Sequence, residues 1–179
     1  MYRTSIDWLG REYSTLEDIL DRKLKVVFVG LNPSPVSVDA GHYHYGMLGK
    51  RFWNTIIRGK IFKPEAGKYY DELLLKQKMG ITDIVKRPTR GLKHLTKDDF
   101  EEGRKQLFQK VIEYKPKILC SIYKSAFEHL FETKFTNLHG LQDNFRFGKT
   151  KIFIMASPFL PREIKDENIR DLKKLLKIK

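Results

Sequence analysis

Apolar and polar residues divide the chain into short, continuous apolar runs and longer amphipathic segments. Three apolar runs stand out, at residues 25–30, 117–122 and 151–156. Continuous apolar character over so few residues is typical of parallel strands that are covered on both faces. The segments between them carry apolar residues at helical spacing, which indicates a parallel sheet flanked by helices. We therefore expect an α/β fold, with residues 1–179 forming a single three-layer α/β/α domain around a short, mostly parallel central sheet.

The helices that this pattern predicts differ in how clearly their ends are marked. Ser14-Thr15-Leu16-Glu17 matches a capping box, so a first helix is expected to run to about Arg22. Thr96 is placed to cap the longest helix, Lys97–Tyr114. The other expected helices cover residues 50–58, 66–78, 125–131 and 163–177.

The segments outside these elements are of several kinds. Residues 1–13 have a mixed composition and are interpreted as a loose N-terminal arm. Residues 80–85 predict a short strand or turn, and residues 137–150 predict irregular or edge structure. The loop at 31–50 is long for a compact domain, and loops of that length are usually functional or disordered.

Composition and charge restrict the class of partner. The chain has 35 Lys and Arg against 22 Asp and Glu, a formal charge of +13. This favours a polyanionic partner, nucleic acid first and an anionic membrane second, although a solvated Lys-rich surface is an alternative. The single cysteine, Cys120, excludes an internal disulfide and a protein-held iron–sulfur cluster. No signal peptide and no membrane-length apolar run stand out, so we expect a soluble, cytoplasmic protein.

The first candidate site begins at Asn32, which follows a buried strand and precedes Pro33. In α/β proteins, ligands bind in the crevice beyond the carboxyl ends of the strands. A carboxamide there can hold a water molecule through its oxygen while its NH2 group donates elsewhere. The alternative is an Asx turn, which is common before proline. The residues alone leave both open.

Four aromatic residues follow in the same loop: His42, Tyr43, His44 and Tyr45. Their rings can stack on nucleobases, an interaction of roughly 1–3 kcal/mol per base. Alternatively, some of them pack in the core. No third and fourth ligands appear at a spacing that suits a metal with the two histidines, so we expect no metal site.

The second candidate site is the segment Ala156-Ser157-Pro158-Phe159-Leu160-Pro161-Arg162, at the end of the third expected strand. It should therefore lie at the same edge of the sheet as Asn32. An apolar residue between two prolines suits a wedge that enters the minor groove of DNA. The alternative is that Phe159 or Leu160 packs inward, as large apolar side chains usually do.

Taken together, Gly30-Leu31-Asn32-Pro33, the His/Tyr loop and Arg51-Phe52-Trp53 resemble the mismatch-specific uracil/thymine-DNA glycosylase family, part of the uracil-DNA glycosylase superfamily. The likeness continues through residues 80–89, 102–105 and 114–116. It implies a uracil-DNA glycosylase-like fold and a monofunctional DNA glycosylase that starts base excision repair. Such an enzyme flips and hydrolyses uracil out of mismatched duplex DNA, with thymine or other deaminated or modified bases as alternatives. It implies no cofactor, double-stranded DNA as partner, and a monomer.

The resemblance also implies roles for single residues. Asn32 matches the residue that positions the hydrolytic water, and Leu160 and Arg162 match the wedge and its polar neighbour. The residues expected at the base are Leu31, Ser37, His44, Tyr45, Asp83 and Thr89. Those expected on DNA are Phe159, Leu160, Arg162 and, from their charge, Lys86 and Arg87.

Two positions depart from the family pattern. Asp83 stands where relatives tend to carry Asn or Lys; an ionised carboxylate would favour a base edge with N–H groups, pair with Lys86, or cap a helix or turn. Ala156 lacks the side chain that relatives use near the departing base. This second departure supports an alternative function, a catalytically weak or inactive DNA-binding module of the same fold. An RNA-binding α/β protein is a further alternative.

Overall fold

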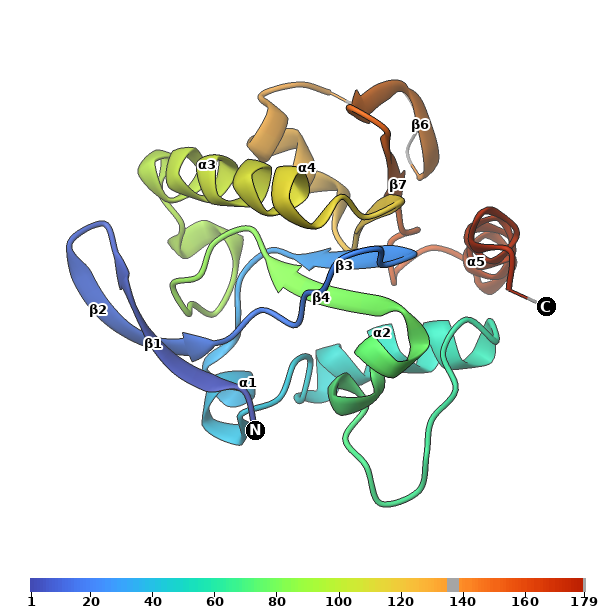
Figure 1. Cartoon of the computed structure of the whole chain (residues 1–179), viewed down its shortest axis with the longest axis horizontal. Coiled ribbons are helices and arrows are strands. Elements are labelled where there is room, and N and C mark those ends of the chain that lie inside the picture. The colour runs from blue at the N-terminus through green and yellow to red at the C-terminus, as the bar shows by residue number, and fades with distance from the viewer. Residues whose placement is uncertain (135–138, 179) are drawn as a thin grey trace.

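The computed structural model describes residues 1–134 and 139–178 (Figure 1). The elements in chain order are β1 (Arg3–Trp8), β2 (Arg11–Leu16), β3 (Val26–Gly30), α1 (Pro35–Ala40), α2 (Met47–Arg58), the 3-10 turns η1 (Asp71–Leu73) and η2 (Leu75–Gln77), β4 (Met79–Asp83), the 3-10 turn η3 (Leu92–His94), α3 (Lys97–Tyr114), β5 (Ile118–Ser121), α4 (Lys124–Phe131), β6 (Gly140–Phe147), β7 (Thr150–Ile154) and α5 (Arg162–Leu176).

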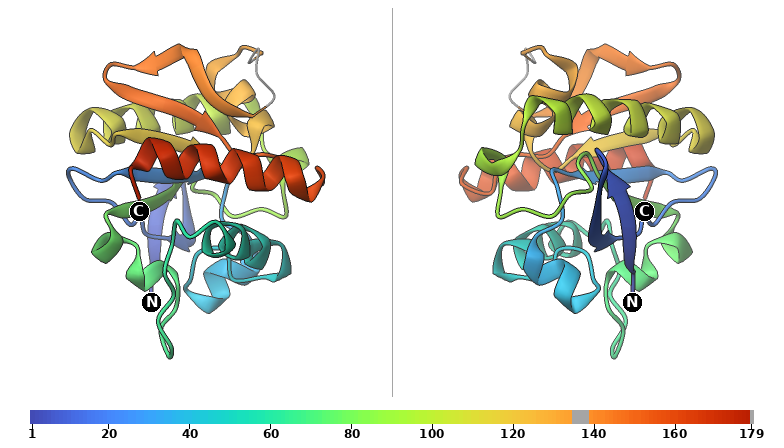
Figure 2. Two further views of the ribbon diagram at one scale, coloured as in Figure 1. Left: turned by 90° about the vertical axis from the view of Figure 1, so that its right-hand side faces the viewer. Right: turned by 90° about the vertical axis from the view of Figure 1, so that its left-hand side faces the viewer.

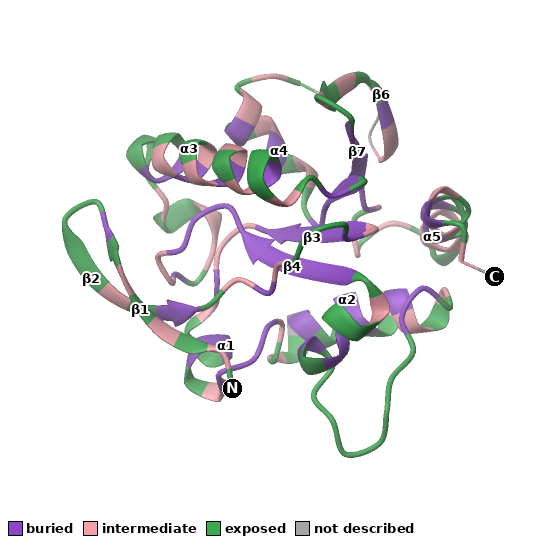
Figure 3. Cartoon of the chain, viewed as in Figure 1, coloured by how far each residue is buried: buried purple, intermediate pink, exposed green. Residues whose placement is uncertain are grey.

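Within the described residues, the central sheet has five strands in the order β4-β3-β5-β7-β6. The first four run parallel, and β6 is antiparallel to β7. Every residue of β3, β4 and β5 is buried, and Figure 3 shows this for β3 and β4 at the centre of the molecule. The expected α/β fold with a mostly parallel sheet is confirmed.

Helices cover both faces of the sheet. On one face, Phe28, Ile81 and Phe153 pack against side chains of α2 and α5. On the other face, Val27 and Val29 pack against α3 and α4. Figure 2 shows these layers from two sides, with α3 above strands β3 and β4 and with α1 and α2 below them. The alternation of buried side chains along each strand therefore separates two hydrophobic cores.

The N-terminal predictions are wrong. Residues 3–16 form a two-stranded antiparallel hairpin, in which Ser5 is opposite Ser14 and Trp8 is opposite Arg11. The apparent capping box thus lies mostly in β2, because pairing with β1 overrides the local helix signal. Trp8 is only 1% exposed, so the arm is packed against the rest of the protein.

Other differences concern loops and ends. The loop at 31–50 contains α1, and α2 starts at Met47 rather than at residue 50. The helix expected at 66–78 is replaced by an exposed loop and the two short turns η1 and η2, with Gly67 and Lys78 at positive φ angles near its two ends. The edge structure expected at 137–150 is β6 and the start of β7; residues 137 and 138 lie outside the described residues.

None of the helices that the structure describes is both long enough and apolar enough to cross a membrane.

Candidate active site

A pocket of about 500 Å³ opens at the carboxyl ends of β3, β4 and β5. The structure brings six of the expected residues to its wall. They are Leu31, Asn32, Ser37, His44, Asp83 and Thr89. Tyr45 is not among the lining residues; it borders a neighbouring pocket of about 790 Å³ on the other side of the 42–47 segment.

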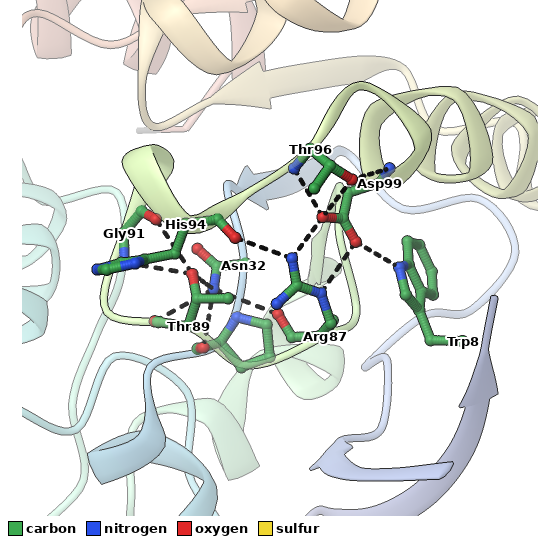
Figure 4. A network of polar contacts seen from close by, with 9 residues as sticks. Trp8, Asn32, Arg87, Thr89, Gly91, His94, Thr96 and Asp99 are labelled. Carbon is green, nitrogen blue, oxygen red and sulfur yellow. Dashed lines mark hydrogen bonds and ion pairs between the residues drawn. The ribbon is translucent and has the colours of Figure 1, made fainter. Parts of the chain in front are cut away.

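The Asn32 side chain is fixed by its NH2 group. Nδ2 donates to the Thr89 hydroxyl at 2.9 Å, to the carbonyls of Thr89 and Pro33 at 3.2 Å, and to the Arg87 carbonyl at 3.3 Å (Figure 4). Three of these four contacts go to a segment more than 50 residues away, so the side chain does more than close a local Asx turn. Because the NH2 group is engaged by this segment and by the Pro33 carbonyl, the amide oxygen is the group that remains to accept a hydrogen bond.

The loop that holds Asn32 is itself anchored through Arg87. Its guanidinium forms an ion pair with the buried Asp99 and donates to the His94 carbonyl at 2.9 Å (Figure 4). Asp99 also accepts from the Trp8 indole at 2.8 Å and from Thr96. Burial opposes ionisation of Asp99, but these hydrogen bonds outweigh it and lower its pKa to about 2. Arg87 therefore supports the loop, and its expected contact with DNA stays a prediction from its charge.

Lys86 is also turned inward. Its ammonium is buried and donates to Asp18 at 2.8 Å, to the Tyr43 hydroxyl at 3.1 Å and to the Leu16 carbonyl. Asp18 receives a second ammonium from Lys110 at 2.6 Å. Burial disfavours the charged form of Asp18, but the two lysines lower its pKa to about 2. The charge of Lys86 is thus used inside the protein, which argues against the expected contact with DNA.

Asp83 is 3% exposed and sits opposite Gly30 in the parallel register. A Cβ on residue 30 would collide with Asp83 Oδ1, so the glycine makes room for this carboxyl. Oδ2 is buried and has no hydrogen-bond partner among the described residues. Burial raises the pKa of Asp83 to about 7, and the charge of Asp18 adds to the shift. The expected pairing with Lys86 is not formed, since that ammonium is bound to Asp18.

His44 lies beside this carboxyl. Its Cε1 would be 3.9 Å from a Cβ on Gly30, and its ring packs on Phe52 with centroids 4.7 Å apart. Its Nε2 is buried without a partner in the described part of the chain. Burial lowers the pKa of His44 to about 4, so the ring is neutral at physiological pH. Two buried polar groups thus face the same region of the pocket without being satisfied by the protein.

The four aromatic residues of the loop divide into two kinds. His42 and Tyr43 are buried, and His42 pairs with Asp71 at 3.0 Å and stacks on Tyr69 with centroids 3.6 Å apart. Tyr45 is 47% exposed, and its backbone N–H donates to the Ser37 hydroxyl at 3.3 Å. The alternative that some of these rings pack in the core is therefore confirmed for His42 and Tyr43, whereas the Tyr45 ring is exposed.

The second segment forms a turn that presents an apolar residue. Phe159 is 85% exposed, and the Leu160 N–H donates to the Ser157 carbonyl at 3.1 Å. Leu160 is partly buried, so inward packing is excluded for Phe159 and holds in part for Leu160. Arg162 is exposed and lies 3.4 Å from Asp166.

Asn168 on α5 secures the base of this turn, a role that sequence reasoning missed. Its Oδ1 accepts from the Ala156 N–H at 2.9 Å, and its Nδ2 donates to the Ile154 carbonyl at 3.2 Å. Asn168 is 3% exposed and precedes the buried Ile169. A polar residue on the inward face of an amphipathic helix was the available signal. Tyr123, which lines the pocket after β5, was missed as well.

The fold and the site define an α/β protein with a strand-end pocket, whose wall includes a carboxamide fixed through its NH2 group and a buried carboxyl. The family model for the uracil DNA glycosylase superfamily matches residues 17–167. The chain therefore belongs to the uracil DNA glycosylase superfamily. The match covers β3 to the first turns of α5, and so includes both candidate segments.

Proposed function

We propose that the protein is a monofunctional DNA glycosylase that flips and hydrolytically removes uracil from mismatched duplex DNA. Membership of the superfamily supports glycosylase chemistry. The observation that carries the proposal is the Asn32 side chain, which lines the strand-end pocket and whose NH2 group is engaged by four acceptors, so that its oxygen remains to accept from water. Thymine and other deaminated or modified bases are alternative substrates.

In this mechanism the extruded base occupies the 500 Å³ pocket, and Tyr45, an exposed ring that borders the neighbouring pocket, stacks on the base as it enters. Mispaired bases cost least to unstack, which contributes to selectivity. Breaking the glycosidic C–N bond leaves positive charge on the sugar, and the bonding electron pair departs with the base. The Asn32 amide oxygen accepts a hydrogen bond from a water molecule, whose oxygen then bonds to the anomeric carbon. A neutral amide is a weak base, so the water attacks a sugar that is already cationic, and its proton passes to solvent.

The proposed DNA-binding surface includes fewer residues than were expected from the sequence. Phe159 is the exposed apolar group that can fill the gap left by the flipped nucleotide, with Leu160 behind it in the turn. Arg162 lies at the same end and can contact a phosphate. Lys86 is left out of this proposed surface because its ammonium is buried and bound to Asp18, whereas Arg87 is partly exposed and stays a predicted contact.

The test is release of uracil from a duplex with one G·U pair, by wild type and by Asn32→Ala. Asn54→Ala, on the exposed face of α2, is the matched control. We expect Asn32→Ala to lose at least a hundredfold in the single-turnover rate, on the order of one lost transition-state hydrogen bond, and the control to keep the wild-type rate. Equal rates for Asn32→Ala and wild type would remove Asn32 from the mechanism.

A second candidate function is a DNA-binding module that has lost turnover. Ala156 favours it: the backbone N–H of this residue is bound to Asn168, and its methyl group offers no donor to a departing base. This candidate predicts tight, salt-sensitive binding to duplex or abasic DNA without base release. Release of any base by wild type rejects it. Gain of release in Ala156→Asn, where wild type has none, would support it.

A further inference from the structure

We propose that Asp83 acts on the base as a neutral carboxylic acid, forming a pair of hydrogen bonds with a lactam edge, the adjacent N–H and C=O that uracil, thymine and hypoxanthine share. This inference rests on the proposed function and deepens it. It makes Asp83 a specificity-determining and pH-sensing residue of the pocket.

The position of the carboxyl carries the argument. Asp83 ends β4 and lies next to Gly30, the last residue of β3, so it stands at the same edge of the sheet as Asn32. It lines the pocket, is 97% buried, and its Oδ2 has no partner. A buried polar group without a partner is costly, and such groups in native proteins call for an explanation. A ligand in this pocket that forms hydrogen bonds with the Asp83 carboxyl would explain why this group is buried without a partner among the described residues.

The surroundings provide no dedicated counter-ion. Lys86 and Lys110 favour the ionised form of Asp83, but both ammonium groups are bound to Asp18, at 2.8 and 2.6 Å, and Asp18 itself disfavours it. The remaining titratable groups near it are neutral at pH 7. They are His44 from the aromatic loop, Tyr43 from the core and Tyr123 from the segment after β5. Burial is therefore the dominant influence, and a pKa of about 7 leaves both forms populated near neutral pH.

The two forms offer different chemistry to a base. The acid donates its O–H to the base carbonyl and accepts from the adjacent N–H, which satisfies both partners. The carboxylate only accepts, so it faces the base carbonyl with no proton between two oxygens. It also opposes the negative charge that develops on the departing base, where a neutral or donating group would stabilise it. The protonated form is thus the active one, and base release should fall as the pH rises through about 7.

The experiment compares pH profiles of single-turnover uracil release between pH 5.5 and 9 for wild type and Asp83→Asn. Asparagine keeps one donor and one acceptor and cannot ionise. We expect the wild-type rate to fall by about tenfold per pH unit above its midpoint, and the Asp83→Asn profile to be flat over this limb. Asp83→Leu should be slow at every pH. The control is Asp143→Asn on the exposed side of β6, which should keep the wild-type profile.

A binding measurement separates this inference from the proposed function. The probe is a duplex with 2′-fluoro-2′-deoxyuridine opposite guanine, whose glycosidic bond resists cleavage, compared with the same duplex without uracil. We expect wild type to prefer the uracil duplex more strongly at pH 6 than at pH 8.5, and Asp83→Asn to show no such change. If no base is released at any pH, the proposed function fails, while this preference still tests Asp83. The same pH dependence in wild type and Asp83→Asn, in release or in binding, overturns the inference.

Discussion

The Thr89 hydroxyl accepts a hydrogen bond from Asn32 Nδ2 at 2.9 Å and in turn donates to the Gly91 carbonyl at 3.1 Å. This contact joins the end of β3 to the loop after β4, so the orientation of the Asn32 amide depends on a second segment of the chain. The water-positioning group is in this way set by tertiary structure as well as by the Asn-Pro sequence.

Thr89→Val should lower the rate of base release by about tenfold, since a net hydrogen bond contributes about 1–1.5 kcal/mol. The valine has a similar volume but cannot hold the Asn32 amide. The effect should appear in kcat with little change in KM, and Thr89→Ser should restore most of the rate. Thr55→Val removes a comparable hydroxyl–carbonyl bond on α2 and serves as the control. An equal loss in the control would contradict the positioning role.

Asp99→Asn should lower the free energy of unfolding at pH 7 by about 3 kcal/mol, as expected when a buried ion pair loses one charge. The carboxylate accepts from Arg87, Trp8 and Thr96, and its pKa is lowered to about 2. Its stabilisation is therefore present above the unfolded-state pKa near 4 and is lost as the pH falls through about 2.

Urea unfolding measured from pH 7 to pH 2 checks this sign. Wild type should lose stability steeply between about pH 4 and pH 2, and Asp99→Asn should show a shallower loss. A parallel decline in the two proteins would show that Asp99 does not carry the linkage.

Lys86→Met should destabilise the protein by about 3 kcal/mol, because Asp18 loses one of its two ammonium partners in the interior. The slope of log affinity for duplex DNA against log salt should not change, since Lys86 releases no counterions from DNA. Arg162→Met should reduce that slope by about one phosphate contact while leaving stability within about 0.5 kcal/mol. A reduced salt slope in Lys86→Met would show that Lys86 does contact DNA phosphates.

Phe159→Ala should reduce base release from duplex DNA by about tenfold or more and leave single-stranded substrate almost unaffected. Filling the gap in the base stack matters only where a stack exists. Because the ring is 85% exposed, the melting temperature should be unchanged. Leu160→Ala, at a partly buried position, should lower the melting temperature as well as the duplex activity. Equal losses on duplex and single strands would remove Phe159 as the wedge.

The elements that could be predicted from the sequence are those whose structure is determined within a single segment. The runs at β3, β5 and β7 are continuous and apolar because both faces of these strands are covered, and this alone indicates a parallel sheet. The cap at Thr96 is satisfied by Asp99 three residues later, so the start of α3 was predictable. The pairing of Ser14 with Ser5 was not predictable in this way. A hairpin depends on a second strand, and the capping-box pattern at residues 14–17 carries no information about that strand.

The sequence by itself determined the fold class, the candidate Asn32 and the two polar segments at strand ends. These follow from periodicity, and from the rule that the carboxyl ends of parallel strands share one edge of the sheet. Only the tertiary structure decided the environment of each charge: Lys86 and Arg87 are held by Asp18 and Asp99, whereas Asp83 Oδ2 has no partner in the part of the chain that the structure describes. Burial and ion pairing depend on residues between 12 and 91 positions apart, so no local pattern reports them.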